Sequence, residues 1–157
     1  MRPALFRFVW LAAAITAATM SASMSVQGAG KIPVVSARSY ASGAATIKVT
    51  GAFGVNQAIP INTQASFSDG EMTWLQFGDS GSEAPNALVT ISPDEIGVSV
   101  SRGKQIATAG GDACTGKMDV TRNSINANYK CLDVTSYDPR SSKMSKVNIE
   151  IVLTAKS

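Results

Sequence analysis

The chemistry open to this sequence depends first on its two cysteines, Cys114 and Cys131, because the chain contains no histidine. Without histidine, a serine or cysteine nucleophile lacks its usual base, and the common zinc and copper sites lack a usual ligand. Redox-active cysteines usually lie two residues apart in a C-x-x-C arrangement. These two are much farther apart, so we interpret them as a structural disulfide.

A second stretch with catalytic residue types is GDSGS, in which Ser80 occupies the position of a serine-protease nucleophile. That chemistry requires a base for the serine proton, and the chain has no histidine to supply it. The loop also offers oxygen atoms for calcium at Asp79, Ser82 and Glu83, but their spacing matches no established calcium loop. We interpret residues 78–86 as a polar connection, and we predict no metal and no other cofactor.

Paired carboxylates could support acid–base catalysis, which in glycosidases needs two carboxyl groups roughly 5 to 9.5 Å apart across a cleft. Asp94 and Glu95 are adjacent in sequence, and neighbouring side chains of an extended chain point apart. The other acidic residues are dispersed. We therefore predict that the protein is not an enzyme, and a small Asp- or Glu-dependent hydrolase is the last of three alternatives.

Exposed aromatic and basic residues could instead form a binding surface. Trp74 lies in a segment that is apolar on both faces, so one face could pack in the core while the other contacts a ligand. Tyr137 and Arg140 lie in an expected loop, and loops on rigid scaffolds often carry recognition. We predict Trp74, Tyr137 and Arg140 as contact residues. The alternatives are a central core strand for Trp74 and a merely solvated loop for the other two.

The cysteines fit opposite ends of a β-hairpin, whose two strands and turn are residues 114–120, 125–131 and 121–124. Antiparallel pairing then places Cys114 opposite Cys131, Gly116 opposite Tyr129, Met118 opposite Ala127 and Val120 opposite Ile125. A tighter turn would keep these faces but set the cysteines diagonally, beyond comfortable bonding reach. The disulfide therefore selects the register, and it contributes about 3 kcal/mol on the chain-entropy view.

Alternation of apolar and polar residues predicts further short strands. They are residues 45–53, 58–67, 72–77, 86–92, 95–101, a return strand from 105, and 146–155. Pro60 makes the second of these an edge strand or a strand start. No convincing helical period follows the N-terminal region. The predicted fold is an antiparallel β-sandwich of about seven or eight strands with one disulfide.

The first 28 residues have the features of a signal peptide: basic Arg2 and Arg7, an apolar run over 8–18, and small residues before the cleavage point. The apolar run is shorter than the roughly 20 residues of a membrane span. Cleavage after Gly28 lowers the formal net charge from +3 to +1, and the basic residues form no stripe. We therefore expect a secreted or periplasmic protein with no transmembrane anchor after cleavage and no nucleic-acid partner.

The C-terminal part of the chain, with "INANYKCLDVTSYDP" followed by a Ser/Lys-rich loop and "KVNIEIVLTA", resembles mycobacterial LpqH-type lipoprotein antigen domains. The resemblance covers about 40 residues and implies an envelope-associated β-domain without catalytic machinery. The leader lacks the cysteine that those lipoproteins carry for lipidation. The resemblance assigns no functional role to any residue of this chain.

These observations predict a cleaved signal peptide over 1–28, a partly flexible N-terminal segment over 29–45 and one β-sandwich domain over 46–157. The expected function is that of an exported, non-catalytic β-domain that binds a cell-envelope component or a protein partner. The alternative is a carrier that holds a lipid or another apolar ligand between its sheets.

Overall fold

The computed structural model describes Ile32 and residues 34–157. The predicted signal peptide therefore lies outside the described residues. Packing of the domain begins N-terminal to residue 46, because the Val35 and Tyr40 side chains are buried in the core. The Tyr40 backbone N–H donates to the Ser66 carbonyl at 3.2 Å, which fixes this segment to the rest of the sheet.

The described chain is all-β, with one 3₁₀ turn (Gly111–Ala113), and this confirms the predicted fold class. Its eleven strands are β1 (Arg38–Ser39), β2 (Ser42–Gly51), β3 (Val55–Pro60), β4 (Phe67–Ser68), β5 (Thr73–Phe77), β6 (Asn86–Ile91), β7 (Ile96–Arg102), β8 (Gln105–Gly110), β9 (Cys114–Val120), β10 (Ser124–Asp138) and β11 (Lys143–Lys156). The expected strand over 58–67 is divided between β3 and β4. None of the described residues belongs to a helix with the length and apolar character of a membrane span.

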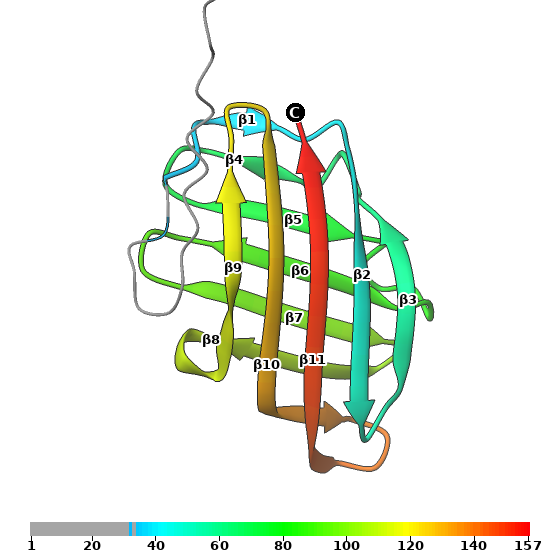
Figure 1. Ribbon diagram of the computed structural model, residues 1–157. Coiled ribbons are helices and arrows are strands. Elements are labelled where there is room, and N and C mark those ends of the chain that lie inside the picture. Colours follow the sequence, from blue (N-terminus) through cyan, green and yellow to red (C-terminus); the bar gives the residue numbers. More distant parts are fainter. Residues whose placement is uncertain (1–31, 33) are drawn as a thin grey trace, which may run out of the picture.

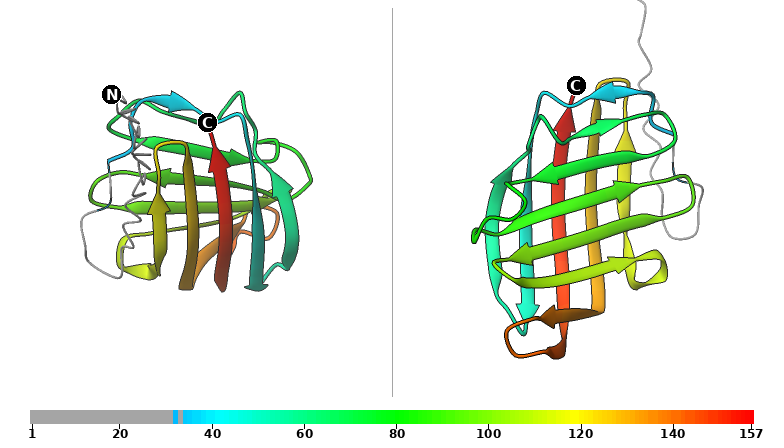
Figure 2. Two further views of the ribbon diagram at one scale, coloured as in Figure 1. Left: turned by 45° about the horizontal axis from the view of Figure 1, so that its top comes forward. Right: turned by 180° about the vertical axis from the view of Figure 1, so that it is seen from behind.

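The strands form one continuous antiparallel sheet in the order β1-β4-β5-β6-β7-β8-β10-β11-β2-β3, with β9 paired to β10 beside this path. The sheet curls over itself, so that β2, β3, β9, β10 and β11 form a front layer and β4 to β8 form a back layer (Figure 1). The strands of the two layers cross steeply, as the reverse view also shows (Figure 2). The predicted sandwich of seven or eight strands was therefore wrong in its details: the fold is a curled half-barrel with more strands.

A bend in β10 joins the two layers. Between Cys131 and Val134 the pairing of β10 with β11 shifts by one residue, and Asp133 has a φ of 53°. The Asp133 N–H donates to Asn148 Oδ1 at 3.0 Å, and the Asp133 carbonyl accepts from Lys146 Nζ at 2.8 Å. This β-bulge turns the strand, as bulges do at the corners of sheets. Its C-terminal end then pairs with β8 of the back layer.

The hairpin of β9 and β10 has the predicted register. The structure pairs Cys114 with Cys131, Gly116 with Tyr129, Met118 with Ala127 and Val120 with Ile125. The disulfide is formed, and the Cα atoms of its two cysteines lie 4.0 Å apart. That short separation is typical of pairs that do not exchange backbone hydrogen bonds in an antiparallel ladder. Cross-strand alternation together with the disulfide therefore predicted this element correctly.

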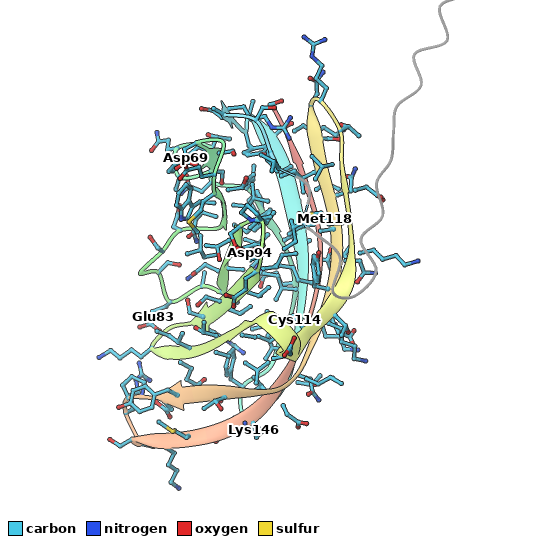
Figure 3. The ribbon with its side chains drawn as sticks, turned by 90° about the vertical axis from the view of Figure 1, so that its left-hand side faces the viewer. Asp69, Glu83, Asp94, Cys114, Met118 and Lys146 are labelled. Carbon is cyan, nitrogen blue, oxygen red and sulfur yellow. A yellow bond between two sulfur atoms is a disulfide. The ribbon has the colours of Figure 1, made fainter. Side chains whose placement is uncertain are left out.

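Apolar side chains from both layers fill the space between them (Figure 3). Ile47 and Ile149 of the front layer and Leu75, Phe77 and Val98 of the back layer are completely buried. Such alternating strands bury one face of each layer and leave the other face to solvent. Because the interior is filled, a partner could contact only the outer faces of the two layers or the strand ends around the bend in β10.

Candidate binding surface

Three large apolar side chains lie exposed in a row on the outer face where β10 joins the back layer. Ile106 of β8 is opposite Tyr137 of β10, and Tyr137 is opposite Met144 of β11. Their exposed fractions are 46%, 43% and 75%. Because cross-strand partners share a face, the three form one continuous strip, which we call the bend strip.

Two solvent-open clefts lie near this end of the sheet and share Gln105 and Asp138 in their walls, and Tyr137 of the bend strip lines the first of them. The first has a volume of about 190 Å³ and is lined by Ala52, Phe53, Gln105, Ser136, Tyr137, Asp138, Ser141, Lys143 and Ser145. The second has a volume of about 170 Å³ and is lined by Glu83, Arg102, Gly103, Lys104, Gln105, Asp138 and Arg140. Both are smaller than the roughly 300 to 1,000 Å³ of pockets that enclose a small-molecule ligand. They are therefore better suited to a projecting side chain of a partner than to a whole ligand.

Opposite charges organise the second cleft. Arg140 Nη2 lies 3.9 Å from Glu83 Oε1, with both side chains well exposed. Such a surface pair contributes little to stability. Arg102 Nη1 donates to the Gly54 carbonyl at 2.7 Å, which holds that guanidinium against the turn between β2 and β3. Of these two arginines, Arg140 is held among the described residues only by an exposed ion pair, so its guanidinium is the one available to a partner.

The position of Arg140 depends on the tight turn between β10 and β11. Asp138 Oδ1 accepts the Arg140 backbone N–H at 2.9 Å, and Oδ2 accepts the Ser141 hydroxyl at 3.0 Å. These hydrogen bonds hold the pKa of the Asp138 carboxyl below its usual value. Ser142 completes the turn with a φ of 52°, in the left-handed region. The acidic side chain is thus used to order the turn.

Of the three predicted contact residues, the structure brings two to this end of the molecule. Tyr137 lies on the bend strip and Arg140 lines the second cleft. Trp74 of β5 is separated from β10 by β6, β7 and β8, so it belongs to a different region of the back layer. Its ring packs against Phe67, with ring centroids 4.8 Å apart. The expectation that Tyr137 lies in a long loop was wrong, because β10 extends to Asp138 and only residues 139–142 form the turn.

The residues of the GDSGS loop make local contacts. Asp79 Oδ1 accepts from Asn62 Nδ2 at 3.3 Å, and the Ser82 hydroxyl donates to the Asp79 carbonyl at 2.9 Å. Glu83, the third oxygen donor considered for calcium, faces Arg140 instead. Within the described part of the chain, no three His, Cys, Asp or Glu side chains gather in a way that could hold a metal ion.

Sequence reasoning missed two members of the bend strip, Ile106 and Met144. Ala107 is buried, and neighbouring residues of a strand face opposite sides. Strand alternation alone would therefore have placed Ile106 on the outer face. That signal was present in the predicted return strand after residue 105. Nothing local indicated that Met144 would lie beside Tyr137, because β11 begins three residues earlier than its alternating pattern.

Comparisons of the chain with protein-family models, with curated proteins and with solved structures found no match. The resemblance to LpqH-type lipoprotein antigens therefore stays a prediction.

Proposed function

We propose that this chain is an exported, non-catalytic β-domain that binds a protein partner in the cell envelope through the bend strip. The observation that carries the proposal is the row of Ile106, Tyr137 and Met144, exposed together on the sheet at the end of β10, with Arg140 in the turn that follows. Tyrosine, methionine and arginine are enriched at the centres of protein interfaces. An exposed apolar row next to cations and small clefts fits a partner with apolar and acidic side chains.

The packing of the interior favours a protein that binds a partner at its surface over one that carries an apolar ligand between its layers. Leu75 and Phe77 of one layer and Ile149 and Met118 of the other are completely buried in a single core. A lipid between the layers would have to displace such side chains, and refilling a close-packed core is costly. The carrier is therefore the weaker alternative.

The carboxylates near the clefts also support a non-catalytic role. Asp138 is held by its own turn, and its lowered pKa favours the charged form, whereas a general acid needs a raised pKa. Glu83 faces Arg140 across an exposed ion pair. Neither carboxyl group has the surroundings expected of an acid catalyst, so the small hydrolase is the least supported alternative.

Export is proposed from the leader-like sequence over 1–28 together with the disulfide. Disulfides persist in oxidising compartments such as the periplasm and the cell exterior. The bond between Cys114 and Cys131 is consistent with that location. After cleavage we expect a protein without a transmembrane anchor, either secreted or periplasmic.

A second candidate function is binding of a cell-envelope glycan, and it is favoured by the packed ring pair of Phe67 and Trp74. Phe67 is 44% exposed on the outer face of the back layer. An aromatic surface on a sheet can stack against sugar rings. We expect Trp74→Ala to abolish retention on isolated envelope glycan if this surface binds it, and Tyr137→Ser to have no effect there.

The test of the leading proposal places a photo-crosslinking amino acid at position 106, 137 or 144 of the protein in its own host. The matched control is Val152, which is 50% exposed on the outer face of the front layer. We expect one discrete adduct from the first three positions and none from Val152. Adding Tyr137→Ser should reduce the adduct from position 106 by about tenfold, as for loss of an interface anchor. Equal adducts from Val152, or an adduct unaffected by Tyr137→Ser, would contradict the proposal.

A further inference from the structure

The strand β9 forms an open edge of the front layer, because within residues 34–157 it pairs with β10 alone. The Thr121 N–H donates to the Ser124 carbonyl at 2.9 Å, so these two residues form a hydrogen-bonded pair at the turn. Hydrogen-bonded and non-hydrogen-bonded pairs alternate along an antiparallel ladder. The backbone N–H and C=O groups of Gly116, Met118 and Val120 therefore point away from β10, toward the open edge.

This edge lacks the protection found at the opposite edge of the same layer. There, β3 ends in Pro60, which has no N–H to offer, and Ile61 forms a bridge with Phe77 of the back layer. Natural proteins commonly block sheet edges with proline or a bulge. The strand β9 has neither, and its ladder with β10 is regular from Val120 to Cys114.

The core is also incompletely covered beside β9. The inward-facing side chains of Cys114 and Val120, at the two ends of β9, are only partly buried, whereas Met118 between them is completely buried. Apolar surface left at an open edge would be covered by one more strand. The edge therefore offers both unpaired backbone groups and apolar side chains to an added strand.

We propose that the added strand is β9 of a second copy of this chain, paired antiparallel about a two-fold axis at Met118. Residues whose backbone groups point outward then pair: Met118 with Met118 of the other copy, and Gly116 with Val120. On the outer face, Lys117 of each copy lies opposite Asp119 of the other. Opposite charges across a sheet stabilise pairing, and like charges oppose it. This interaction is independent of the bend strip, which lies at the other end of β10.

The charges select this register over its two neighbours. An axis at Lys117 would place the two copies of Lys117 opposite each other, and an axis at Asp119 would do the same with two carboxylates. Both alternatives keep the outward backbone groups paired, so charge is what distinguishes the three registers. Lys117 and Asp119 make no ion pair with any other described residue, which leaves both charges available.

The experiment measures the dimer dissociation constant of the protein purified from its host, by sedimentation equilibrium at low ionic strength. Lys117→Asp and Asp119→Lys should each weaken the dimer by at least about tenfold, because each places two like-charge pairs at the interface. Lys156→Asp is the control, since it reverses a charge on β11 away from this edge. Melting temperatures establish that each variant is folded.

Complementation then tests the register. The chain carrying both Lys117→Asp and Asp119→Lys should dimerise as the natural chain does, and an equal mixture of the two single variants should form a heterodimer. A monomer at all concentrations would overturn the proposal. A dimer that ignores the charge reversals, or one that dissociates on Tyr137→Ser, would overturn it as well, because the interface would then lie elsewhere.

Discussion

Removal of the disulfide should weaken the domain by a predictable amount. The bond joins residues 17 apart in sequence, and closing a loop of that length removes about 3 kcal/mol of chain entropy from the unfolded state. Cys131 is completely buried, so replacing it by alanine adds the cost of a small cavity. Reduction without mutation keeps both sulfur atoms and isolates the effect of the cross-link.

The assay is urea unfolding of the oxidised protein, the reduced protein and the Cys114→Ala/Cys131→Ala variant. With a denaturant dependence of about 1.5 kcal/mol per M, 3 kcal/mol lowers the midpoint by about 2 M. The double variant should unfold at a slightly lower concentration than the reduced protein. The denatured mass of the natural protein should be two hydrogens below that of the reduced chain.

A reduced protein whose midpoint lies within about 0.3 M of the oxidised one would refute this reasoning. It would mean that the hairpin persists in the unfolded chain, so that the bond removes little entropy. The local turn at Thr121 to Ser124 makes this a real test, because its hydrogen bonds could hold the two strands together without the disulfide.

Three further predictions concern the sheet. Gly116→Ala should destabilise by about 1 to 3 kcal/mol in thermal unfolding, because an added Cβ would overlap the Asn128 carbonyl oxygen and lie 2.8 Å from the Tyr129 Cα. Gly54→Ala, with open space around its Cβ, is the control. Asn148→Leu should lower the free energy of urea unfolding by about 1 kcal/mol, since it removes the acceptor of the Asp133 N–H. Asn126→Leu on β10 is the control and should lower it by less. Burial raises the pKa of Tyr129 to about 12, so the unfolding free energy should fall as the pH rises from about 10 to about 12, and Tyr129→Phe should remove that slope. A slope unchanged in Tyr129→Phe would assign it to another group.

The sequence predicted the elements that depend on local pattern. Alternation and the two cysteines together determined the hairpin register, because a slip by one residue would reverse its buried face. The closing strand was found for the same reason, with Val147, Ile149 and Leu153 all buried. In these segments the residues that alternate as apolar in the sequence are the ones buried in the structure.

The bend in β10 could not be predicted in this way. Residues 132–138 are polar enough to suggest a loop, yet Val134 and Ser136 are buried and the strand continues. The bulge at Asp133 depends on side chains of β11, which are distant in sequence. The two-layer sandwich was expected because nothing local indicates that one strand passes from one layer to the other.

The same bulge also creates the candidate binding surface. Only because β10 turns after Asp133 does its end reach β8, so that Ile106 comes to lie beside Tyr137. Tyr137 and Arg140 could be selected from the sequence because they are an aromatic and a cationic residue near a turn. The position of Ile106 beside Tyr137 could not be predicted, because it depends on the bend in β10. Asn148→Leu should therefore weaken both the stability of the domain and partner binding through the bend strip. Gly116→Ala lies in β9, away from the bulge, so it should lower stability without changing the affinity of the folded protein for the partner.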